Sequence, residues 1–351
     1  MLKKGDVKMK KSIVFMALFF VLSTVLIACS NSNADTTSKE ELTIVWYPNE
    51  SGNDLKASRD EIGKVIEEAT GKKVNHKLTT DYAVAIETIA NGNAELAFMG
   101  AQGYIEAKNK SDDVEPLVVP SGESGTLEDA VYYSWLAVRE DNAEQHKKGD
   151  EFIIDNIVDS KFSFVSNSST SGFKVPSSSI ISYFSKEGKW KDLTQEDLME
   201  GGKFFKEVMY GDSHQGSAVN LLTERADVAA FCDTCVSNYV ELAEGEENRA
   251  GSIYKVKEDA ADPFTSLSGK RFTLISVTPV LNAPFVANLD SLGEEDFKKI
   301  QEIMTSEEVK NNEGIFAPED SDKVALFKRT ANEQFVVAED SWFDPIRELS
   351  K

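Results

Sequence analysis

The sequence predicts an α/β fold of two lobes, each with a mainly parallel sheet flanked by helices. Short apolar runs alternate with amphipathic segments along most of the chain, and such alternation is typical of strands and helices that follow one another in a parallel sheet. The length of 351 residues is enough for two lobes. A hydrophobic content of 41% with 28% charged residues indicates a chain that buries a core rather than a disordered one.

The first half of the chain alternates strands and helices most clearly. The segment 58–70 is an example, because Ile62, Val65 and Ile66 recur at helical spacing and Gly71 follows as a helix stop. The elements expected in this half are strands at 41–47, 73–78, 95–100, 114–120 and 132–138, and helices at 58–70, 81–90 and 103–108.

The second half repeats the pattern. The elements expected there are strands at 161–166, 208–210, 226–231 and 271–280, and helices at 177–184, 195–205, 212–222, 293–304 and 321–333. We expect the chain to cross between lobes near 136–139 and 276–280. This assigns 41–136 and 277–351 to lobe 1 and 137–276 to lobe 2. Ligands of open α/β sheets bind at the carboxyl ends of the strands, which predicts a site in the interlobe cleft with hinge closure around the ligand.

Two helix–strand units resemble each other. Tyr82 opens a helix that leads to the strand 94–98, and His214 opens a helix that leads to the strand 226–230. An acidic residue and an apolar run recur at nearly the same spacing in both. Equivalent helix N-termini in two lobes would explain this repetition. The alternative is the general similarity of units that combine strands with a helix.

A hydroxyl-rich turn, Ser168–Gly172, lies between an expected strand and an expected helix. The first backbone N–H groups of a helix have no internal partner, and the helix dipole adds partial positive charge there. The turn therefore suits an anion, to which Ser169, Thr170 and Ser171 would add neutral hydroxyl donors. The alternative is an ordinary Ser/Thr N-cap in a flexible serine loop.

The N-terminus has the pattern of an export signal. A lysine-rich stretch precedes an apolar run at 13–28, as in the charged and apolar regions of a secretory signal. The run ends in Leu26-Ile27-Ala28-Cys29, which resembles a bacterial lipobox. We therefore expect a lipoprotein signal peptide at 1–28, lipid anchoring of the mature protein through Cys29 at the outside of the cell membrane, and a flexible tether at 29–40. An uncleaved signal anchor is the alternative.

Net charge and cysteine content limit the classes of partner and of metal site that the protein can have. The net charge of −22 makes nucleic acid and anionic lipid surfaces poor partners. Cys232 and Cys235 form a Cys-x-x-Cys pair that can form a disulfide outside the cytoplasm, with a redox role as the alternative. The sequence has no second cysteine pair and only three histidines, so we expect no metal site.

Four stretches, 81–83, 95–100, 168–176 and 213–229, resemble the phosphonate-binding proteins of ABC importers, which are periplasmic binding proteins of type II topology. The resemblance runs from about Leu42 to Arg347, and its most specific part is Ser-Thr-Ser-Gly-Phe-x-Val-Pro. By that resemblance, the oxyanion ligands fall on Tyr82, Tyr132, Ser169, Thr170, Ser171 and His214.

Two further residues are candidates from their positions in this sequence. Gln102 follows the glycine that ends the strand 95–100, and Asp233 lies between the two cysteines. Family members that take aminoalkyl phosphonates resemble one another in placing an acid near the amine. Here the matching stretch is Asn282-Ala283-Pro284, without an acid. This favours phosphate, phosphite or a small alkyl phosphonate, with Asp233 as the remaining charge for an amine.

The resemblance implies the extracytoplasmic solute-binding component of an ABC importer, with a small phosphorus oxyanion as ligand and a permease and its ATPase as partners. We expect a monomer without cofactor or metal and without catalysis. A sensory lipoprotein on the same fold is the first alternative. An enzyme is the second, with Ser171 and His214 as the only nucleophile–base pair that the sequence suggests, and no acid tied to them.

Overall fold

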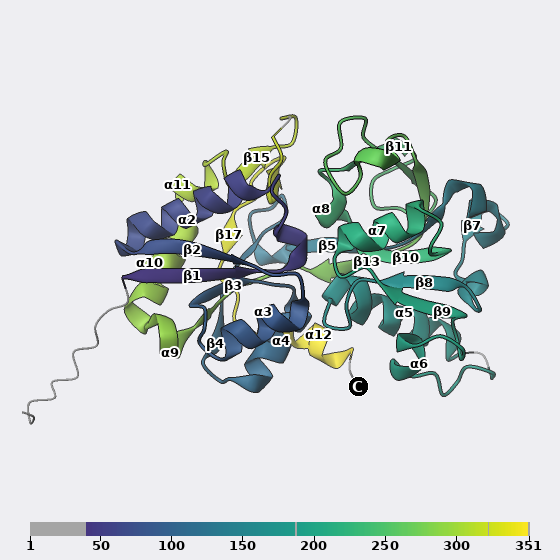
Figure 1. The fold of residues 1–351 in the computed structure, drawn as a ribbon, viewed down its shortest axis with the longest axis horizontal. Helices are drawn as coiled ribbons and strands as arrows, with labels where there is room; N and C mark the ends of the chain where they lie inside the picture. The colour runs from purple at the N-terminus through teal and green to yellow at the C-terminus, as the bar shows by residue number, and fades with distance from the viewer. Residues whose placement is uncertain (1–39, 187, 322, 350–351) are drawn as a thin grey trace, which may run out of the picture. The chain divides into compact units, whose positions relative to one another are not determined.

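The computed structural model of the chain describes residues 40–186, 188–321 and 323–349, which form two large sheets with helices packed on them (Figure 1). The first sheet has the strand order β17 (Phe335–Val336), β4 (Val114–Pro120), β14 (Phe285–Asn288), β3 (Leu96–Phe98), β1 (Glu41–Trp46), β2 (Lys73–Leu78). The second has the order β11 (Val240–Glu244), β12 (Ile253–Val256), β13 (Arg271–Leu281), β5 (Val131–Arg139), β10 (Val228–Cys232), β8 (Lys161–Phe164), β9 (Glu207–Tyr210). The predicted two-lobed α/β architecture is confirmed.

The helices divide between the two sheets. With the first sheet lie η1 (Pro48–Glu50), α2 (Lys56–Thr70), α3 (Tyr82–Ala90), α4 (Ala101–Lys110), α9 (Leu289–Leu292), α10 (Glu294–Met304), α11 (Glu307–Lys310), η7 (Asp340–Phe343) and α12 (Asp344–Glu348). With the second lie η3 (Glu140–His146), η4 (Asp155–Ile157), η5 (Thr170–Lys174), α5 (Val175–Phe184), α6 (Glu196–Met199), α7 (His214–Leu222), α8 (Asp233–Val236) and η6 (Thr265–Leu267). The remaining short elements are η2 (Leu127–Asp129), β6 (Lys147–Lys148), β7 (Glu151–Phe152), β15 (Phe316–Pro318) and β16 (Phe327–Arg329).

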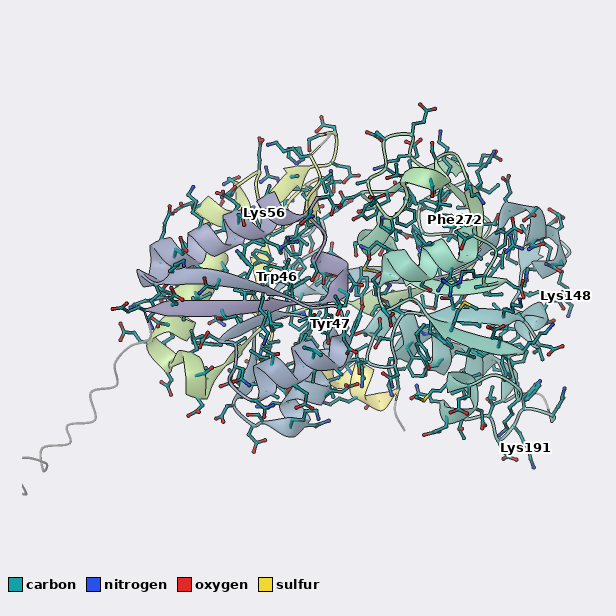
Figure 2. All side chains as sticks on the ribbon, viewed as in Figure 1. Trp46, Tyr47, Lys56, Lys148, Lys191 and Phe272 are labelled. Carbon is teal, nitrogen blue, oxygen red and sulfur yellow. A yellow bond between two sulfur atoms is a disulfide. The ribbon has the colours of Figure 1, made fainter. Side chains whose placement is uncertain are left out.

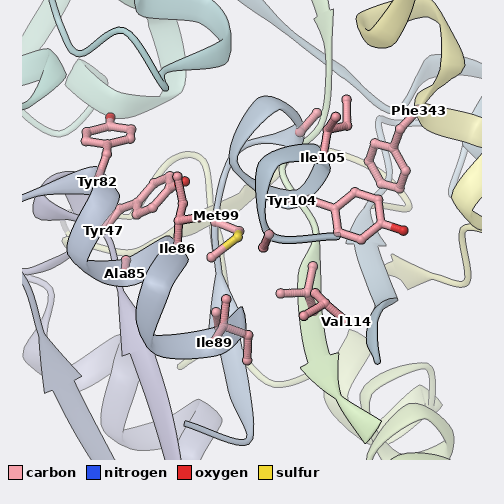
Figure 3. Close-up of a cluster of buried hydrophobic side chains, with 14 of the residues drawn as sticks. Tyr47, Tyr82, Ala85, Ile86, Ile89, Met99, Tyr104, Ile105, Val114 and Phe343 are labelled. Carbon is pink, nitrogen blue, oxygen red and sulfur yellow. The ribbon is translucent and has the colours of Figure 1, made fainter. Parts of the chain in front are cut away.

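Alternation along β1 divides the core of the first lobe into two layers. Ile44 and Trp46 point to the face that α2 and α10 cover. Val45 and Tyr47 point to the other face, which α3 and α4 cover (Figures 2 and 3). Because successive side chains of a strand point to opposite faces, the fully apolar run 44–47 serves both layers. Tyr47 then lies just beyond the end of β1, where polar groups of a site begin.

The second sheet is arranged in the same way. Trp135 and Ala137 of β5 pack with α7, while Leu136 and Val138 pack with α5. The prediction of mainly parallel sheets is wrong for both lobes. In the first sheet β1 pairs parallel with β2 and β3, but the pairs β14–β3, β14–β4 and β17–β4 are antiparallel. The strand directions of the second sheet are mixed as well. Only the pairs β8–β9 and β8–β10 are parallel, because β5, β11, β12 and β13 each pair antiparallel with their neighbours.

The chain passes between the two sheets through 121–130 and 282–284. Strands β5 and β13 pair with each other along almost their whole length, from Val131 opposite Leu281 to Arg139 opposite Phe272, and both belong to the second sheet. The expected lobe boundaries at 136/137 and 276/277 therefore fall inside these two strands. The lobes as separately moving units, and hinge closure between them, stay predictions.

Two predicted helices are wrong. Of 195–205 only α6 is helical, and 321–333 contains β16 instead of a helix. In both places aromatic side chains enter the core from irregular or extended backbone. Phe204 and Phe205 join the cluster around Phe162, while Phe327 packs among Phe316 and Phe335. Tertiary packing of aromatic rings overrode a weak helical spacing.

Replacement of Phe285 by alanine tests the core of the first lobe. The ring is fully buried, with ring centroids 4.7 Å from Phe98 and 5.5 Å from Phe335. We expect Phe285→Ala to lower the free energy of unfolding by about 3–5 kcal/mol, measured by chemical denaturation. Val84→Ala, at a side chain that is 50% exposed, is the control and should change it by less than about 0.5 kcal/mol. A loss below about 1 kcal/mol for Phe285→Ala would contradict this account of the core.

Candidate functional site

A cavity of about 800 Å³ is lined by residues of both lobes. Most of the residues predicted for the site line it: Tyr82, Tyr132, Ser169, Thr170, Ser171, His214 and Asp233. Tyr132 lines the cavity while Tyr133 packs against the apolar cluster on the α7 side of the sheet, as alternation along β5 requires. The structure therefore brings together residues that are up to 151 positions apart in the sequence.

The hydroxyl-rich turn caps a helical segment, as the sequence predicts, but the helix begins earlier than 177. Ser169 is the N-cap of η5, a π-helical turn that runs directly into α5. The Ser169 hydroxyl oxygen accepts from the backbone N–H of Gly172 at 3.1 Å. Ser134 of β5 stabilises the turn by donating its hydroxyl to the carbonyl of Ser171 at 2.6 Å. The N-terminal end of this helical segment thus faces the cavity with its hydroxyls almost completely buried.

Thr170 connects this turn to the first lobe. Its hydroxyl oxygen accepts from the backbone N–H of Gln102 at 2.9 Å, at the start of α4. Residue 100 has to be glycine for this approach, because a Cβ there would lie 2.7 Å from the Thr170 hydroxyl. The Gln102 side chain donates to Glu106 at 2.8 Å and is not among the residues that line the cavity. Gln102 thus meets the turn through its backbone, not through the side-chain donor that we expected.

Asn49 joins the two helix starts that resemble each other in sequence. Tyr82 and His214 are the first residues of α3 and α7, whose N-caps are Asp81 and Ser213. The Asn49 side-chain amide donates to the Tyr82 hydroxyl at 2.7 Å, and its oxygen accepts from the backbone N–H of His214 at 3.0 Å. The first residues of the two helices, one from each lobe, are therefore linked through the side chain of Asn49.

The contacts of His214 determine which nitrogen carries its proton. The backbone N–H of Cys232 donates to Nδ1 at 3.0 Å, so Nδ1 is unprotonated and the proton lies on Nε2. Nε2 lies 3.4 Å from the Ser169 hydroxyl. Burial lowers the pKa of His214 from 6.5 to about 3. The ring is thus a neutral donor aimed at the hydroxyl turn, and its Nδ1 lacks the carboxylate partner of a hydrolytic triad.

Asp233 and the two cysteines form the adjoining wall. A disulfide joins Cys232 and Cys235. The sulfurs lie near His214 but are bonded to each other, so they offer no thiolates to a metal in this state. Asp233 accepts from the backbone N–H of Tyr133 at 2.9 Å, and burial raises the pKa of its carboxyl to about 6 in spite of that hydrogen bond.

Unpaired polar atoms concentrate in the cavity. Among the described residues, a small set of side-chain atoms is buried without a hydrogen-bond partner, and four members of this set belong to cavity-lining residues: Tyr47, Glu50, Ser171 and Gln215. A buried polar group without a partner costs free energy, so such a cluster points to a polar ligand that completes it. Sequence reasoning missed Tyr47, Asn49, Glu50 and Gln215. The signal was available for the first three, because they directly follow the strand β1, and sites form at the carboxyl ends of strands.

Acidic residues outnumber basic ones among the described lining of the cavity. Lys257 and Lys328 are the basic residues there, and each donates its ammonium to backbone carbonyls. Burial raises the pKa values of Tyr82 and Tyr132, so both phenols stay protonated donors at neutral pH. An anion in this cavity would therefore be held by neutral donors.

The expected signal peptide, 1–28, and the lipidated Cys29 lie outside the described residues. Within the described part of the chain, every helix is too short or too polar to cross a membrane.

Comparison with known proteins agrees with this geometry. The family model described as the periplasmic substrate-binding protein of phosphonate ABC transporters matches residues 44–343. The phosphate-import protein PhnD of Mycolicibacterium smegmatis is 27% identical over 276 residues, which are 77% of this chain and 81% of that protein.

Solved structures resemble the chain over most of its length. A binding protein of an ABC phosphonate transporter from Pseudomonas aeruginosa has a TM-score of 0.60 at 20% identity, covering 88% of this chain and 85% of that one. PhnD1 of Prochlorococcus marinus, solved with methylphosphonate, has a TM-score of 0.60 at 16% identity, covering 88% and 97%. The two-lobed periplasmic-binding-protein fold predicted from the sequence is confirmed by these likenesses.

The protonation of His214 can be measured directly. Nitrogen-15 NMR should show an Nε2-protonated neutral ring that does not titrate between about pH 8 and pH 4, because its native pKa of about 3 lies below the ordinary 6.5. The unfolded chain then binds one proton more between these pKa values, so His214 contributes a fall in unfolding free energy of about 1.4 kcal/mol per pH unit as pH drops from 6.5 toward 3. A His214 ring that titrates near pH 6–7 would contradict the hydrogen bond from Cys232.

Proposed function

The chain belongs to the phosphonate-binding family of periplasmic ABC-transporter substrate-binding proteins, and from this we propose that it captures a small phosphorus oxyanion outside the cell for an importer. The observation that carries the proposal is the convergence of buried neutral donors from both lobes on one cavity. Members of this family are transport components that bind their substrates. The proposed partners are accordingly a membrane permease and its ATPase.

The proposed contacts follow from the donors around the cavity. Ser169, Thr170 and Ser171 would bind the oxyanion through hydroxyls and the free backbone N–H groups of η5. Tyr82 and His214 would donate from the two helix starts that Asn49 joins. All of these donors are buried, and all except the Ser171 hydroxyl are already held by a second contact, so little side-chain freedom is lost when the anion binds.

The proposed ligand is phosphate, phosphite or a small alkyl phosphonate. Asn282 and Ala283 line the cavity and bring no charge to the ligand's other end. The names of the related proteins support this class, since one is a phosphate-import protein and another was solved with methylphosphonate. Asp233 is one of several acids that line the cavity, and it is the one that the sequence suggests for the amine of an aminoalkyl phosphonate, which makes such a ligand a separate arm of the test.

We further propose that the protein works as a monomer held at the outer face of the membrane by a lipid on Cys29. The lipobox-like sequence that ends at Cys29 supports the anchor. The acidic net charge of −22 supports attachment through the lipid rather than through basic side chains on an anionic surface.

Isothermal titration with phosphate, phosphite, methylphosphonate and aminoethylphosphonate tests the ligand class. At least one of the first three should bind with a stoichiometry of one and more tightly than aminoethylphosphonate. Absence of binding heat with all four would refute the proposed ligand class, and tightest binding of aminoethylphosphonate would refute the preference for a small uncharged end.

Thr170→Val tests the hydroxyl turn. The change removes a donor with little change in volume, and we expect the binding free energy to fall by about 1–3 kcal/mol in a cavity that closes over the ligand. Thr305→Val removes a hydroxyl that bonds within its own helix and should leave affinity unchanged. Equal affinity of the Thr170 variant and the wild type would exclude Thr170 from the site.

A further inference from the structure

Glu50 is an acid in a cavity built for an anion. It ends η1, directly after Asn49, and lines the cavity beside Tyr82. Its Oε2 atom is buried and has no hydrogen-bond partner among the described residues. An ionised carboxylate with a buried, unpaired oxygen would repel a bound oxyanion and would leave its own charge uncompensated. A carboxyl group at this position therefore needs a role that the neutral donors do not provide.

The surroundings of Glu50 provide little compensation for a negative charge. Arg59 of α2 donates to the backbone carbonyls of Glu50 and Gly52, so its guanidinium is engaged with the backbone of this loop. Arg59 is the cation that lowers the pKa of Glu50. The titratable groups that face this region from the neighbouring elements are Tyr47 after β1, Asp54 before α2, Tyr82 of α3, Tyr132 of β5, His214 of α7, Asp233 of α8 and Tyr239 after it.

Burial, rather than the charges of these neighbours, makes the neutral acid the stable form of Glu50 near neutral pH. Burial raises the pKa of the Glu50 carboxyl to about 8, against the smaller lowering by the backbone, the Asn49 amide and Arg59. Burial raises the pKa values of Tyr82 and Tyr132, and an ionised Glu50 would raise them further. A neutral carboxylic acid has an O–H to donate, whereas a carboxylate has only acceptors.

We propose that Glu50 shares one proton with the bound oxyanion, so that the protein takes up the ligand and one proton as a unit. This inference rests on the proposed function, because it concerns the same cavity. The proton lies either on Oε2 of Glu50, donating to a dianion, or on the ligand as P–OH, donating to the carboxylate. Both descriptions contain the same atoms and the same total of two negative charges, carried either by a dianion beside a neutral acid or by a monoanion beside a carboxylate. In the complex, the phosphorus oxyanion and the Glu50 carboxyl therefore hold one proton between them.

The consequence is a pH dependence of affinity that should disappear when Glu50 is replaced. Above pH 8 both the free carboxyl and the free ligand have lost the shared proton, so binding has to take one up from water. Affinity then falls about tenfold per pH unit. Glutamine has nearly the same shape and donates an N–H without a titratable proton, so Glu50→Gln should bind the dianion with an affinity that is nearly constant over this range.

The experiment is isothermal titration of phosphate, phosphite and methylphosphonate at about pH 8 to 9.5, repeated in buffers of different ionisation enthalpy to count protons. In the wild type, we expect binding to take up nearly one proton and affinity to fall about tenfold per pH unit. In Glu50→Gln we expect neither the proton uptake nor the fall in affinity. Glu87→Gln is the matched control. It removes the same charge from α3 at an exposed ion pair with Lys110, outside the cavity, and should behave as the wild type.

The outcomes separate the two proposals. If the wild type binds none of the three ligands, the proposed function fails and this inference with it. If the wild type binds but its affinity is constant from pH 8 to 9.5, only the proton-sharing role of Glu50 is overturned. The same holds if the affinity of Glu50→Gln falls as steeply with pH as that of the wild type. If Glu50→Gln does not fold, carbon-13 NMR of the Glu50 carboxyl in the wild type decides. An ionised carboxyl together with a phosphorus-31 shift of a fully ionised ligand in the complex at pH 7 overturns the role, because the shared proton is then on neither partner. A proton on either the carboxyl or the bound ligand supports it.

Discussion

The side-chain amide of Asn49 is the contact on which the arrangement of the site depends. It binds the Tyr82 hydroxyl of one lobe and the backbone N–H of His214 in the other, and all three groups are buried. A single small amide thereby sets two helix N-termini toward one cavity. Gln215 adds to this connection, because its side chain donates both to the Asn49 carbonyl and to the Cys235 carbonyl. The loop after β1 and the start of α7 are thus held together at the cavity.

The side-chain donors around the hydroxyl turn are uncharged. Burial opposes every charged form, so it lowers the pKa of His214 and raises those of Asp233, Tyr82 and Tyr132. The net charge of −22 means that the long-range field also opposes an anion. Short hydrogen bonds from uncharged donors and from free helix N–H groups have to supply the attraction. In the proposed function, such an arrangement would select a ligand by the positions of its oxygen atoms rather than by charge alone.

Structural precision in this cavity comes from close backbone approach as well as from donors. Gly100 permits the Thr170 hydroxyl to reach the start of α4, and Gly103 permits the Tyr47 hydroxyl to lie against the first turn of the same helix. A Cβ at either position would overlap the hydroxyl oxygen. The first lobe therefore shapes the cavity through glycines that leave room for these hydroxyls, while the second lobe contributes the hydroxyl turn.

The sequence by itself determined the two-lobed α/β fold, because strand and helix periodicities are local and the apolar runs were unambiguous over most of the chain. It also determined the hydroxyl turn and the two helix openers, because capping residues act within one turn of their own helix. It failed where aromatic packing decided the backbone, at 195–205 and 321–333.

Tertiary structure alone decided which strands pair, and so placed all of β5 and β13 in the second sheet. It also decided which nitrogen of His214 carries the proton, and it revealed Asn49 and Glu50 as members of the site. These properties depend on partners that are distant in sequence. A hydrogen bond or a desolvated carboxyl has no local signature, because its energy is set by what the fold brings next to it.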